Sequence, residues 1–210
     1  MTSQGRLFLD DEGYADLRTF VSRARALDDE GAIRFQADGL VLAAYAGVLP
    51  GRGLMADGAV MGLRTMRLTR SVTVDTTVSL AAVTDRLARE ASDGLELPPA
   101  SVQTPWAAMT PPRGGWEPVG SLEASVLADA ARAGIAEVAR GASVGSGGAA
   151  VADLRHRVWS RLTETAPPVP AGAAFAAYTL GFLEPAGRCA VVAHGRWTRL
   201  SSPHGHVLVR

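Results

Sequence analysis

A proline-rich stretch near the middle of the chain constrains the fold more than any other feature. Residues 93–119, DGLELPPASVQTPWAAMTPPRGGWEPV, contain six prolines and show neither helical nor strand periodicity. Such a segment cannot continue a helix or a central strand, so it predicts a long connection between domains. We therefore expect an N-terminal domain over residues 1–92 and a C-terminal domain over residues 120–210. Trp106 and Trp116 lie within the connection, and their large apolar rings predict that it packs onto a surface.

The N-terminal part alternates helical and strand patterns. Apolar residues at helical spacing predict a helix over residues 14–27, with Asp10 or Asp11 as its N-cap. Two β-prone runs flank Asp38-Gly39 and predict a hairpin that turns at this pair, because glycine tolerates positive φ. We interpret the following segments as a loop at 50–58, one or two strands within 60–75, and a helix at 78–91 capped by Thr76 or Thr77. This order predicts two helices on an antiparallel sheet.

Helical spacing returns after the connection. Apolar stripes predict helices over residues 122–138 and 151–162, joined by a flexible glycine-rich link at 141–150. Residues 171–183, AGAAFAAYTLGFL, have no charge on any side, which predicts a buried helix. With the strands of the tail, the C-terminal domain is predicted as a three-helix plus three-stranded, winged-helix-like domain. The predicted fold class of the whole chain is α+β.

The tail, RCAVVAHGRWTRLSSPHGHVLVR, predicts three strands joined by tight turns at His194-Gly195 and at residues 202–205. For the pairing we take a two-residue turn at His194-Gly195 and a second loop at residues 201–205. These turns predict the cross-strand pairs Val192–Trp197, Ala190–Arg199, Leu200–His206 and Arg199–Val207. Both faces of the sheet would then be largely apolar, so we expect both to be partly covered.

The histidines of the tail raise the question of a metal site. His204 and His206 are two residues apart, so on a strand they would point to one face, and His194 would add a third nitrogen. Against a metal, the tail contains no carboxylate to orient such ligands, and Ser-Pro-His-Gly is sufficient as a turn. We therefore interpret SPHGH as a turn and assign no metal ligand.

The chain has a formal net charge of zero, so it produces no overall electrostatic field that would attract nucleic acid or a membrane. It contains 21 basic and 21 acidic residues, and every basic one is arginine. Up to Leu97 there are 14 acidic and 11 basic residues, a net of −3, whereas from Pro98 there are 7 and 10, a net of +3. This asymmetry predicts docking between domains or a mildly basic edge for a partner. The candidate basic surface comprises Arg155, Arg157, Arg161, Arg196, Arg199, His204 and Arg210.

Several site classes are excluded or disfavoured by the sequence. The single Cys189 excludes an internal disulfide and begins an apolar strand, so we expect it to be buried and inert. The segment GASVGSGGAAV lacks the lysine of a phosphate loop and follows a helix, not a strand. Ser201 or Ser202 near His204 is not set in a nucleophile elbow. We therefore assign no catalytic residue and no cofactor.

We expect a cytoplasmic protein with no membrane segment. The first residues, MTSQGRLFLDDEG, become acidic before an apolar run develops, unlike a secretory signal. The longest apolar run, residues 171–183, is shorter than the roughly 20 residues of a membrane-spanning helix.

One resemblance supports the interpretation of the C-terminal part. The segment WEPVGSL, the alanine-rich helix after it and the tail RLSSPHGHVLVR resemble uncharacterised proteins of GC-rich actinobacteria. The resemblance covers mainly residues 116–210. It implies no activity, so no residue role is transferred.

The function cannot be determined from the sequence, and three hypotheses remain. The first is a non-enzymatic binding or regulatory module that acts through protein–protein contacts, with a homodimer expected from the small-residue stripe of helix 122–138 and the charge-free segment 171–183. The second is DNA binding by the winged-helix-like domain, but the helix before its hairpin lacks the polar residues that contact bases. An enzyme of unknown type is the third.

Overall fold

The fold is described from a computed structural model that covers residues 5–53, 56–89, 94–142 and 147–210. The chain divides into two compact units, each with helices and antiparallel strands, so the predicted α+β class and two-domain layout are confirmed. The first unit contains Met1–Val48 and Met61–Thr110, and the second contains Leu49–Val60 and Pro111–Arg210. The second unit is therefore assembled from two separate stretches of chain.

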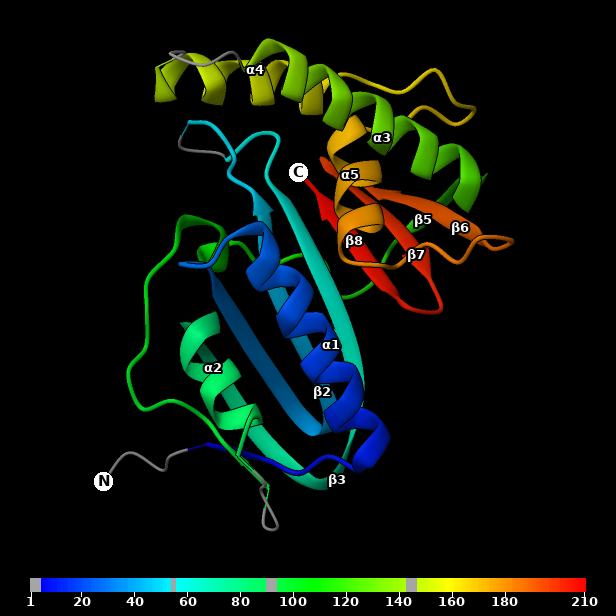
Figure 1. Ribbon diagram of the computed structural model, residues 1–210. Coiled ribbons are helices and arrows are strands. Elements are labelled where there is room, and N and C mark those ends of the chain that lie inside the picture. Colours follow the sequence, from blue (N-terminus) through cyan, green and yellow to red (C-terminus); the bar gives the residue numbers. More distant parts are fainter. Residues whose placement is uncertain (1–4, 54–55, 90–93, 143–146) are drawn as a thin grey trace. The chain divides into compact units, whose positions relative to one another are not determined.

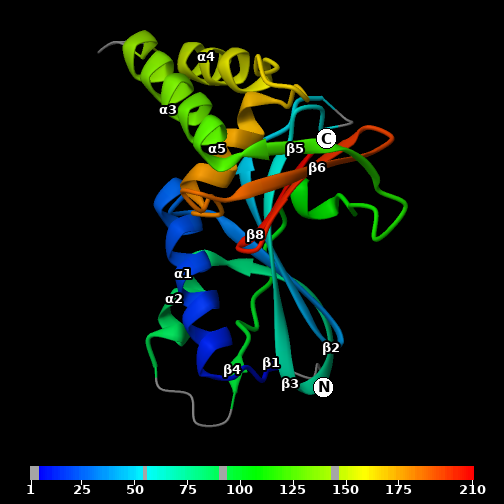
Figure 2. The same cartoon turned by 90° about the vertical axis from the view of Figure 1, so that its right-hand side faces the viewer.

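The first unit is a long β-hairpin with two helices on one face (Figures 1 and 2). Its main elements are α1 (Asp11–Leu27), β2 (Ala32–Leu49), β3 (Val60–Ser79) and α2 (Leu80–Leu87), the outermost residues Leu49 and Val60 already belonging to the second unit. The helix predicted at 14–27 is confirmed as α1, and its apolar stripe is buried. Asp10 is its N-cap, because its Oδ1 accepts a hydrogen bond of 2.8 Å from the Gly13 amide.

The helix predicted at 78–91 begins later and has a different cap. It is α2, whose N-cap Ser79 accepts a hydrogen bond of 3.2 Å from the Ala82 amide. The predicted caps Thr76 and Thr77 instead lie in β3, where their β-branched side chains favour extended backbone. Residues 90 and 91 of the prediction lie outside the described residues.

The predicted hairpin turn at Asp38-Gly39 is wrong, because β2 continues through it. Gly39 has a φ of 70° with open space around its Cα, but the chain does not reverse there. Instead, the buried positions of β2 shift from Ile33, Phe35 and Ala37 to Leu42, Ala44 and Ala46, that is, from odd to even numbers. One extra residue in a strand has this effect, so Gly39 permits a bulge within β2. The reversal occurs within the segment predicted as a loop at 50–58.

The start of the proline-rich connection packs onto the first unit. A short strand β1 (Arg6–Leu7) pairs with β4 (Leu95–Glu96), and the 3-10 helix η1 (Pro105–Ala108) follows. The Val102 amide donates to the carbonyl of Thr77 at 2.9 Å. The indole of Trp106 lies so close to Gly47 that a Cβ there would be 2.5 Å from its Nε1. The prediction that Trp106 packs onto a surface is confirmed.

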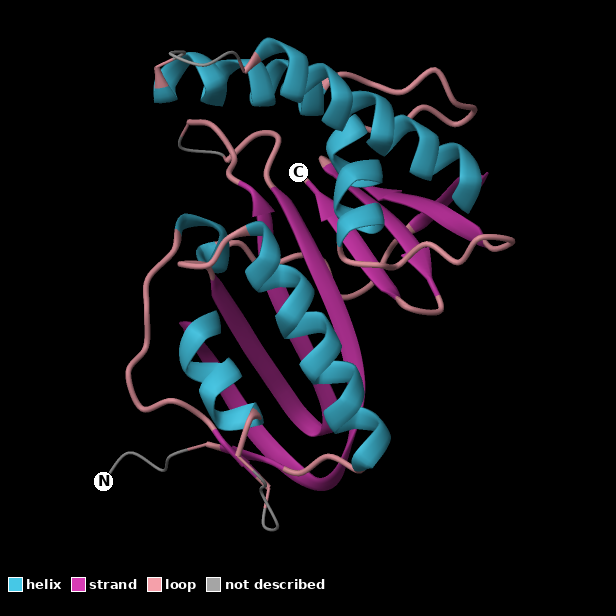
Figure 3. Cartoon of the chain, in the orientation of Figure 1, coloured by secondary structure: helices cyan, strands magenta, loops and turns pink. Residues whose placement is uncertain are grey.

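In the described part of the second unit there are four antiparallel strands and three helices, and Figure 3 shows their arrangement. Its elements are β5 (Glu117–Glu123), α3 (Ala124–Gly141), α4 (Gly148–Ser160), α5 (Ala171–Thr179), β6 (Arg188–His194), β7 (Trp197–Ser202) and β8 (Gly205–Val209). The three predicted strands of the tail are confirmed. Strand β5 was not predicted; it pairs with β6, with Leu122 opposite Cys189. Helix α5 packs on β8, and α3 and α4 pack on α5.

Residues just before β3 form hydrogen bonds with the residue just after β8, inside the second unit. The Gly58 amide donates to the carbonyl of Arg210 at 2.7 Å, and the Arg210 amide donates to the carbonyl of Ala59 at 3.1 Å. The six long strands consequently follow the order β2-β3-β8-β7-β6-β5.

The first turn of the tail lies one residue later than predicted. His194 is opposite Trp197, so Gly195 and Arg196 form the turn, with Gly195 at a φ of 57°. A glycine at the first central position suits a tight hairpin turn as well as one at the second, which explains the error. Val192 therefore faces Arg199 and not Trp197. Because this shift is two residues, the predicted faces of β6 and β7 are unchanged.

The second turn is confirmed at residues 202–205, but the predicted pairing is wrong by one residue. Ser202 is opposite Gly205, with Pro203 and His204 between them, so Leu200 faces Val207 and not His206. A one-residue shift moves every side chain of β8 to the other face. Val191, Leu200, Val207 and Val209 now share one face and are all buried.

The helices of the second unit pack closely through small residues. The buried stripe of α3 includes Ala128, Ala131 and Gly134, and α5 is buried from Gly172 to Ala177, as predicted for a charge-free helix. The surfaces from which a homodimer was expected are therefore largely used within the unit. Helix α4 ends at Ser160, so Leu162 is not part of its stripe and is 64% exposed.

The link predicted at 141–150 is shorter than expected, because Gly148 already begins α4. Part of that segment, residues 143–146, lies outside the described residues. None of the helices in the described part of the chain is both long and apolar enough to cross a membrane.

Candidate functional site

A groove in the second unit is lined by several charged and polar side chains. Its walls are the hairpin tip (residues 49–53 and 56–60), one face of α4 and the ends of β7 and β8. We call it the arginine groove after the guanidinium groups of Arg52, Arg155, Arg196 and Arg210 that line it. All of its residues belong to the second unit.

The hairpin tip is shaped by a tight loop. The amide of Arg52 donates to the carbonyl of Asp57 at 2.9 Å, and the Asp57 amide donates back at 3.0 Å. Gly51 is required there, because a Cβ on it would lie 2.3 Å from the carbonyl oxygen of Ala56. Gly58 has a φ of 77° and approaches the His156 ring, with a built Cβ 3.7 Å from Cε1. The loop thus presents Arg52 and Asp57 opposite α4.

Helix α4 contributes a face of residues three and four apart, namely Ala152, Arg155, His156, Trp159 and Ser160. Trp159 is 5% exposed, and its ring stacks on Phe175 of α5 with centroids 4.3 Å apart. The same ring lies against Gly134 of α3. Trp159 is therefore a fixed part of the groove floor. Asp153 of α4 pairs with Arg52 of the tip, which links the two walls.

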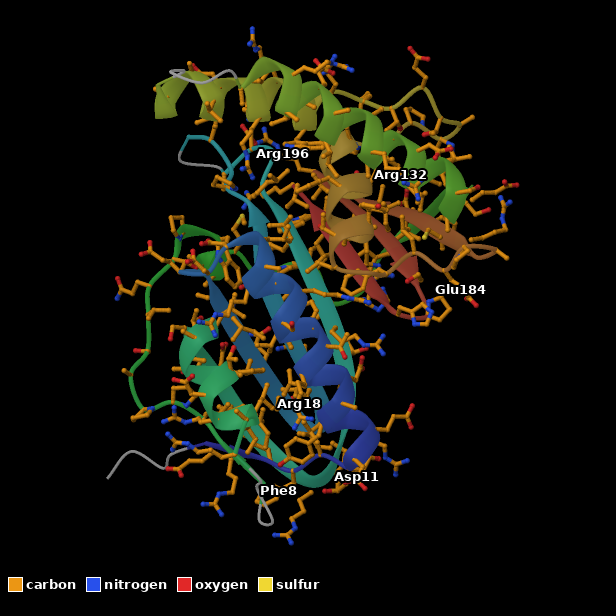
Figure 4. All side chains as sticks on the ribbon, viewed as in Figure 1. Phe8, Asp11, Arg18, Arg132, Glu184 and Arg196 are labelled. Carbon is orange, nitrogen blue, oxygen red and sulfur yellow. The ribbon has the colours of Figure 1, made fainter. Side chains whose placement is uncertain are left out.

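The strand ends supply the remaining cationic groups. Arg196, in the β6–β7 turn, lies toward the hairpin tip (Figure 4), and its Nη1 is 3.6 Å from Oδ1 of Asp57. The guanidinium of Arg210 lies 5.7 Å from the ring centroid of Trp197. Its Nε is buried and has no hydrogen-bond partner among the described residues. A buried donor of this kind is costly unless a partner arrives.

The groove has two lobes that share Arg52, Gly58, His156, Trp159 and Ser160. One lobe, of about 250 Å³, is lined mainly by apolar groups, including Leu49, Pro50 and Ala152. The other, of about 530 Å³, contains the side chains of Asp57, Arg196, Thr198 and Arg210. We refer to them as the apolar lobe and the polar lobe. Their combined size is that of a pocket for a small organic molecule.

The predicted basic surface is divided by the fold. Arg155 lines the apolar lobe of the groove, and Arg196 and Arg210 line its polar lobe. Arg157 is exposed on α4 but does not line it, and Nη2 of Arg161 pairs with Oε2 of Glu137 at 2.6 Å. The other two residues, Arg199 and His204, lie on different parts of the unit.

Arg199 belongs to an aromatic cluster on the sheet. Its guanidinium lies 4.6 Å from the centroid of the Trp116 ring, and burial lowers its pKa. Nδ1 of His194 lies 2.8 Å from the carbonyl oxygen of Gly115, and its ring packs edge-on to Trp116. This confirms that Trp116 packs onto a surface. It fixes the second half of the proline-rich connection on the sheet.

The three histidines of the tail have three different neighbours. Nδ1 of His206 is 2.9 Å from Oγ of Ser201, and Nε2 of His204 is 3.9 Å from Oε2 of Glu184, at the other end of the sheet from Arg196 (Figure 4). His194 contacts Gly115. The described residues contain no cluster of three metal-ligating side chains. Cys189 is buried, as predicted, and burial raises the pKa of its thiol.

The sequence analysis did not identify several polar residues that line the groove, namely Arg52, Asp57, His156 and Ser160. His156 and Ser160 are four residues apart within the helix predicted at 151–162, with Trp159 beside them, and this polar face was a usable signal. No local pattern marks Arg52 and Asp57, because they reach the groove only when the hairpin tip joins the second unit.

Comparison with known proteins gives two family matches and no curated relative. No curated protein matches the chain at a significant level. Residues 111–210 match the family described as a domain of unknown function (DUF8185), which supplies α4 and the strand ends of the groove. Residues 1–108 match a second such family (DUF8010), which supplies the hairpin tip. Since that second match covers more than half of the sequence, the chain belongs to the family of the DUF8010 domain.

Proposed function

We propose that the protein is a non-enzymatic binding module and that the arginine groove binds a small anionic ligand. The observation behind the proposal is the excess of cationic groups in one concave site. Four arginines line it against one lining carboxylate, Asp57. Asp153 stands beside it and pairs with Arg52.

Arginine is well suited to this role. Its guanidinium group stays charged and offers paired donors that match the oxygens of a phosphate or carboxylate. Gathering four such groups is unfavourable without counter-charge, and a bound anion would supply it. The buried Nε of Arg210 would also gain a partner from a ligand oxygen.

Binding of inorganic phosphate to the full chain, measured by isothermal titration calorimetry, tests the proposal. Arg52→Ala and Arg196→Ala, which remove arginines of the polar lobe, should each weaken binding by about tenfold or more, the usual effect of losing a charge-assisted hydrogen bond. Arg157→Ala is the matched control, because it removes the same charge from an exposed position of the same unit outside the groove. Absence of saturable binding, or an equal loss in the control, would contradict the proposal.

Association through protein contacts remains part of the proposal. Val126 and Ile135 are large apolar residues of α3 that are 41% and 37% exposed. They support a homodimer or a protein partner at the outer face of this helix. Light scattering tests the homodimer: a mass of 21.9 kDa at micromolar concentration would contradict it.

DNA binding by the second unit has less support. In a winged-helix protein the helix before the hairpin enters the major groove. Here that helix is α5, and its residues from Gly172 to Ala177 are buried. The arginines of α4 are the remaining candidates for contacts to phosphates. Binding to duplex DNA that weakens with salt and with Arg157→Ala would favour this alternative.

A further inference from the structure

We infer that the ligand of the arginine groove is a bipartite molecule, in which an anionic group is joined to a compact apolar body. This inference rests on the proposed anion binding and specifies what else the ligand contains. It follows from the two lobes of the groove and from the residues they share.

The walls of the apolar lobe are mainly hydrophobic. Leu49 and Pro50 line it from the hairpin tip, and Ala152 and Trp159 line it from α4. Leu49 also contacts the start of α5, where a Cβ on Gly172 would lie 2.9 Å from its Cδ1. Because Trp159 is stacked on Phe175 on one side, the lobe cannot collapse by moving this ring inward. A preformed apolar hollow of about 250 Å³ accommodates one ring system or a short acyl chain.

The polar lobe is suited to the charged end of the same molecule. Arg196 and Arg210 line it, and Thr198 adds a hydroxyl group. Asp57 would repel an anion, but its carboxylate is already paired with Arg196 at 3.6 Å. An inorganic anion would fill only this lobe and would leave the apolar walls exposed to water.

The shared residues connect the two binding modes. Arg52, His156 and Ser160 line both lobes, so the two lobes are adjacent and a ligand held by these residues would contact both. A ligand with only an apolar group would leave the excess positive charge of the polar lobe unbalanced. A bipartite anion therefore satisfies both lobes together, whereas either fragment alone satisfies one.

Calorimetric titration of the full chain with 1-naphthyl phosphate, inorganic phosphate and 1-naphthol tests the inference. Burying about 100 Å² of apolar surface predicts that naphthyl phosphate binds on the order of 50-fold more tightly than phosphate. Arg196→Ala should weaken both phosphates. Ala152→Leu should fill the apolar lobe and remove most of the gain from the naphthyl group, with phosphate binding retained. Ala149→Leu, an exposed position of α4 outside the groove, is the matched control.

Each other outcome has a definite meaning. Equal affinity for phosphate and naphthyl phosphate overturns the bipartite ligand but leaves the proposed anion binding intact. Binding of 1-naphthol as tightly as naphthyl phosphate, or of none of the three, overturns both. Adenosine monophosphate and octyl phosphate then distinguish the source of the apolar body: either one binding more tightly than inorganic phosphate supports the inference, and the tighter identifies a nucleoside or an acyl chain.

Discussion

Gly134 of α3 lies directly against the indole ring of Trp159 of α4. A Cβ built on Gly134 would be 2.3 Å from Cζ3 of Trp159 and 2.7 Å from Cη2. The same ring stacks on Phe175 of α5. The floor of the arginine groove therefore depends on the absence of a side chain one helix away.

Gly134→Ala is expected to destabilise the second unit by about 2 kcal/mol. Overpacking costs about 1–3 kcal/mol, and the better helix propensity of alanine offsets at most about 1 kcal/mol of it. Urea unfolding followed by tryptophan fluorescence measures the change. Gly148→Ala is the control, since no atom lies within 4 Å of a Cβ there, and it should be neutral or slightly stabilising. Equal stability of the two variants would disprove this packing.

Arg34→Ala is expected to release η1 together with the residues that follow it, and to destabilise the first unit by about 2 kcal/mol. Arg34 of β2 donates to both carboxylate oxygens of Asp75 at 2.8 Å, and this bond raises its pKa. Its Nη1 also donates to the carbonyls of Ala107 at 2.8 Å and Met109 at 3.3 Å. Because Asp75 is half exposed, we assign most of the effect to the two carbonyls.

Hydrogen exchange at residues 105–110 measures the release of this segment. Arg67→Ala removes an exposed arginine from β3 and serves as the control. Unchanged exchange in Arg34→Ala would contradict the role of Arg34.

The stability of the protein is expected to fall above about pH 9, in part because of Cys189. Burial raises the pKa of this thiol from its ordinary value of 9.0. The unfolded chain therefore loses the proton first, so the contribution is complete below pH 9 and is lost as pH rises through the folded pKa. Burial also raises the pKa of Tyr14, which adds a decline of the same sign above about pH 10.

Unfolding free energies from pH 7 to 10.5 test this, and Cys189→Ala should remove the earlier part of the decline. The thiol should react with Ellman's reagent only when the protein unfolds. Rapid labelling of the folded protein at pH 8 would be inconsistent with the buried position.

Gly39→Ala is expected to cost about 1–2 kcal/mol through backbone strain alone. The φ of Gly39 is 70°, and nothing lies within 4 Å of a built Cβ, so no steric clash contributes. Gly114→Ala is the control, because Gly114 also has open space but no positive φ. Thermal unfolding compares them; a neutral Gly39→Ala would mean that β2 has no bulge at this position.

The features predicted from the sequence are those encoded by neighbouring residues. The stripe of α1, the charge-free α5 and the turn at Ser202–Gly205 depend on spacing and turn chemistry within one segment, and all three are confirmed. Gly39 shows where this fails, since glycine permits a bulge as readily as a turn. Residues 40–46, LVLAAYA, are apolar or aromatic at every position, so the sequence did not show the shift of buried positions that marks the bulge.

The missed features depend on contacts distant in sequence. Strand β5 exists because Leu122 and its neighbours pair with β6, more than sixty residues later. The register of β8 was missed because a difference of one residue in the loop reverses all its faces. The groove was not predicted for the same reason: Arg155, Arg196 and Arg210 of the expected basic surface lie in one sequence region, whereas Arg52 comes from the distant hairpin tip.

Because the second unit is built from two separate stretches of chain, it cannot be completed until the last of them has been synthesised. The hairpin tip leaves the ribosome long before Arg210, whose backbone forms hydrogen bonds with Gly58 and Ala59. The strands of the first unit can pair before the hairpin tip has formed its hydrogen bonds with Arg210. A fragment that starts after the proline-rich connection would lack the hairpin tip and therefore one wall of the groove. The two family matches are separate in sequence, but the groove is complete only when residues from both have folded together.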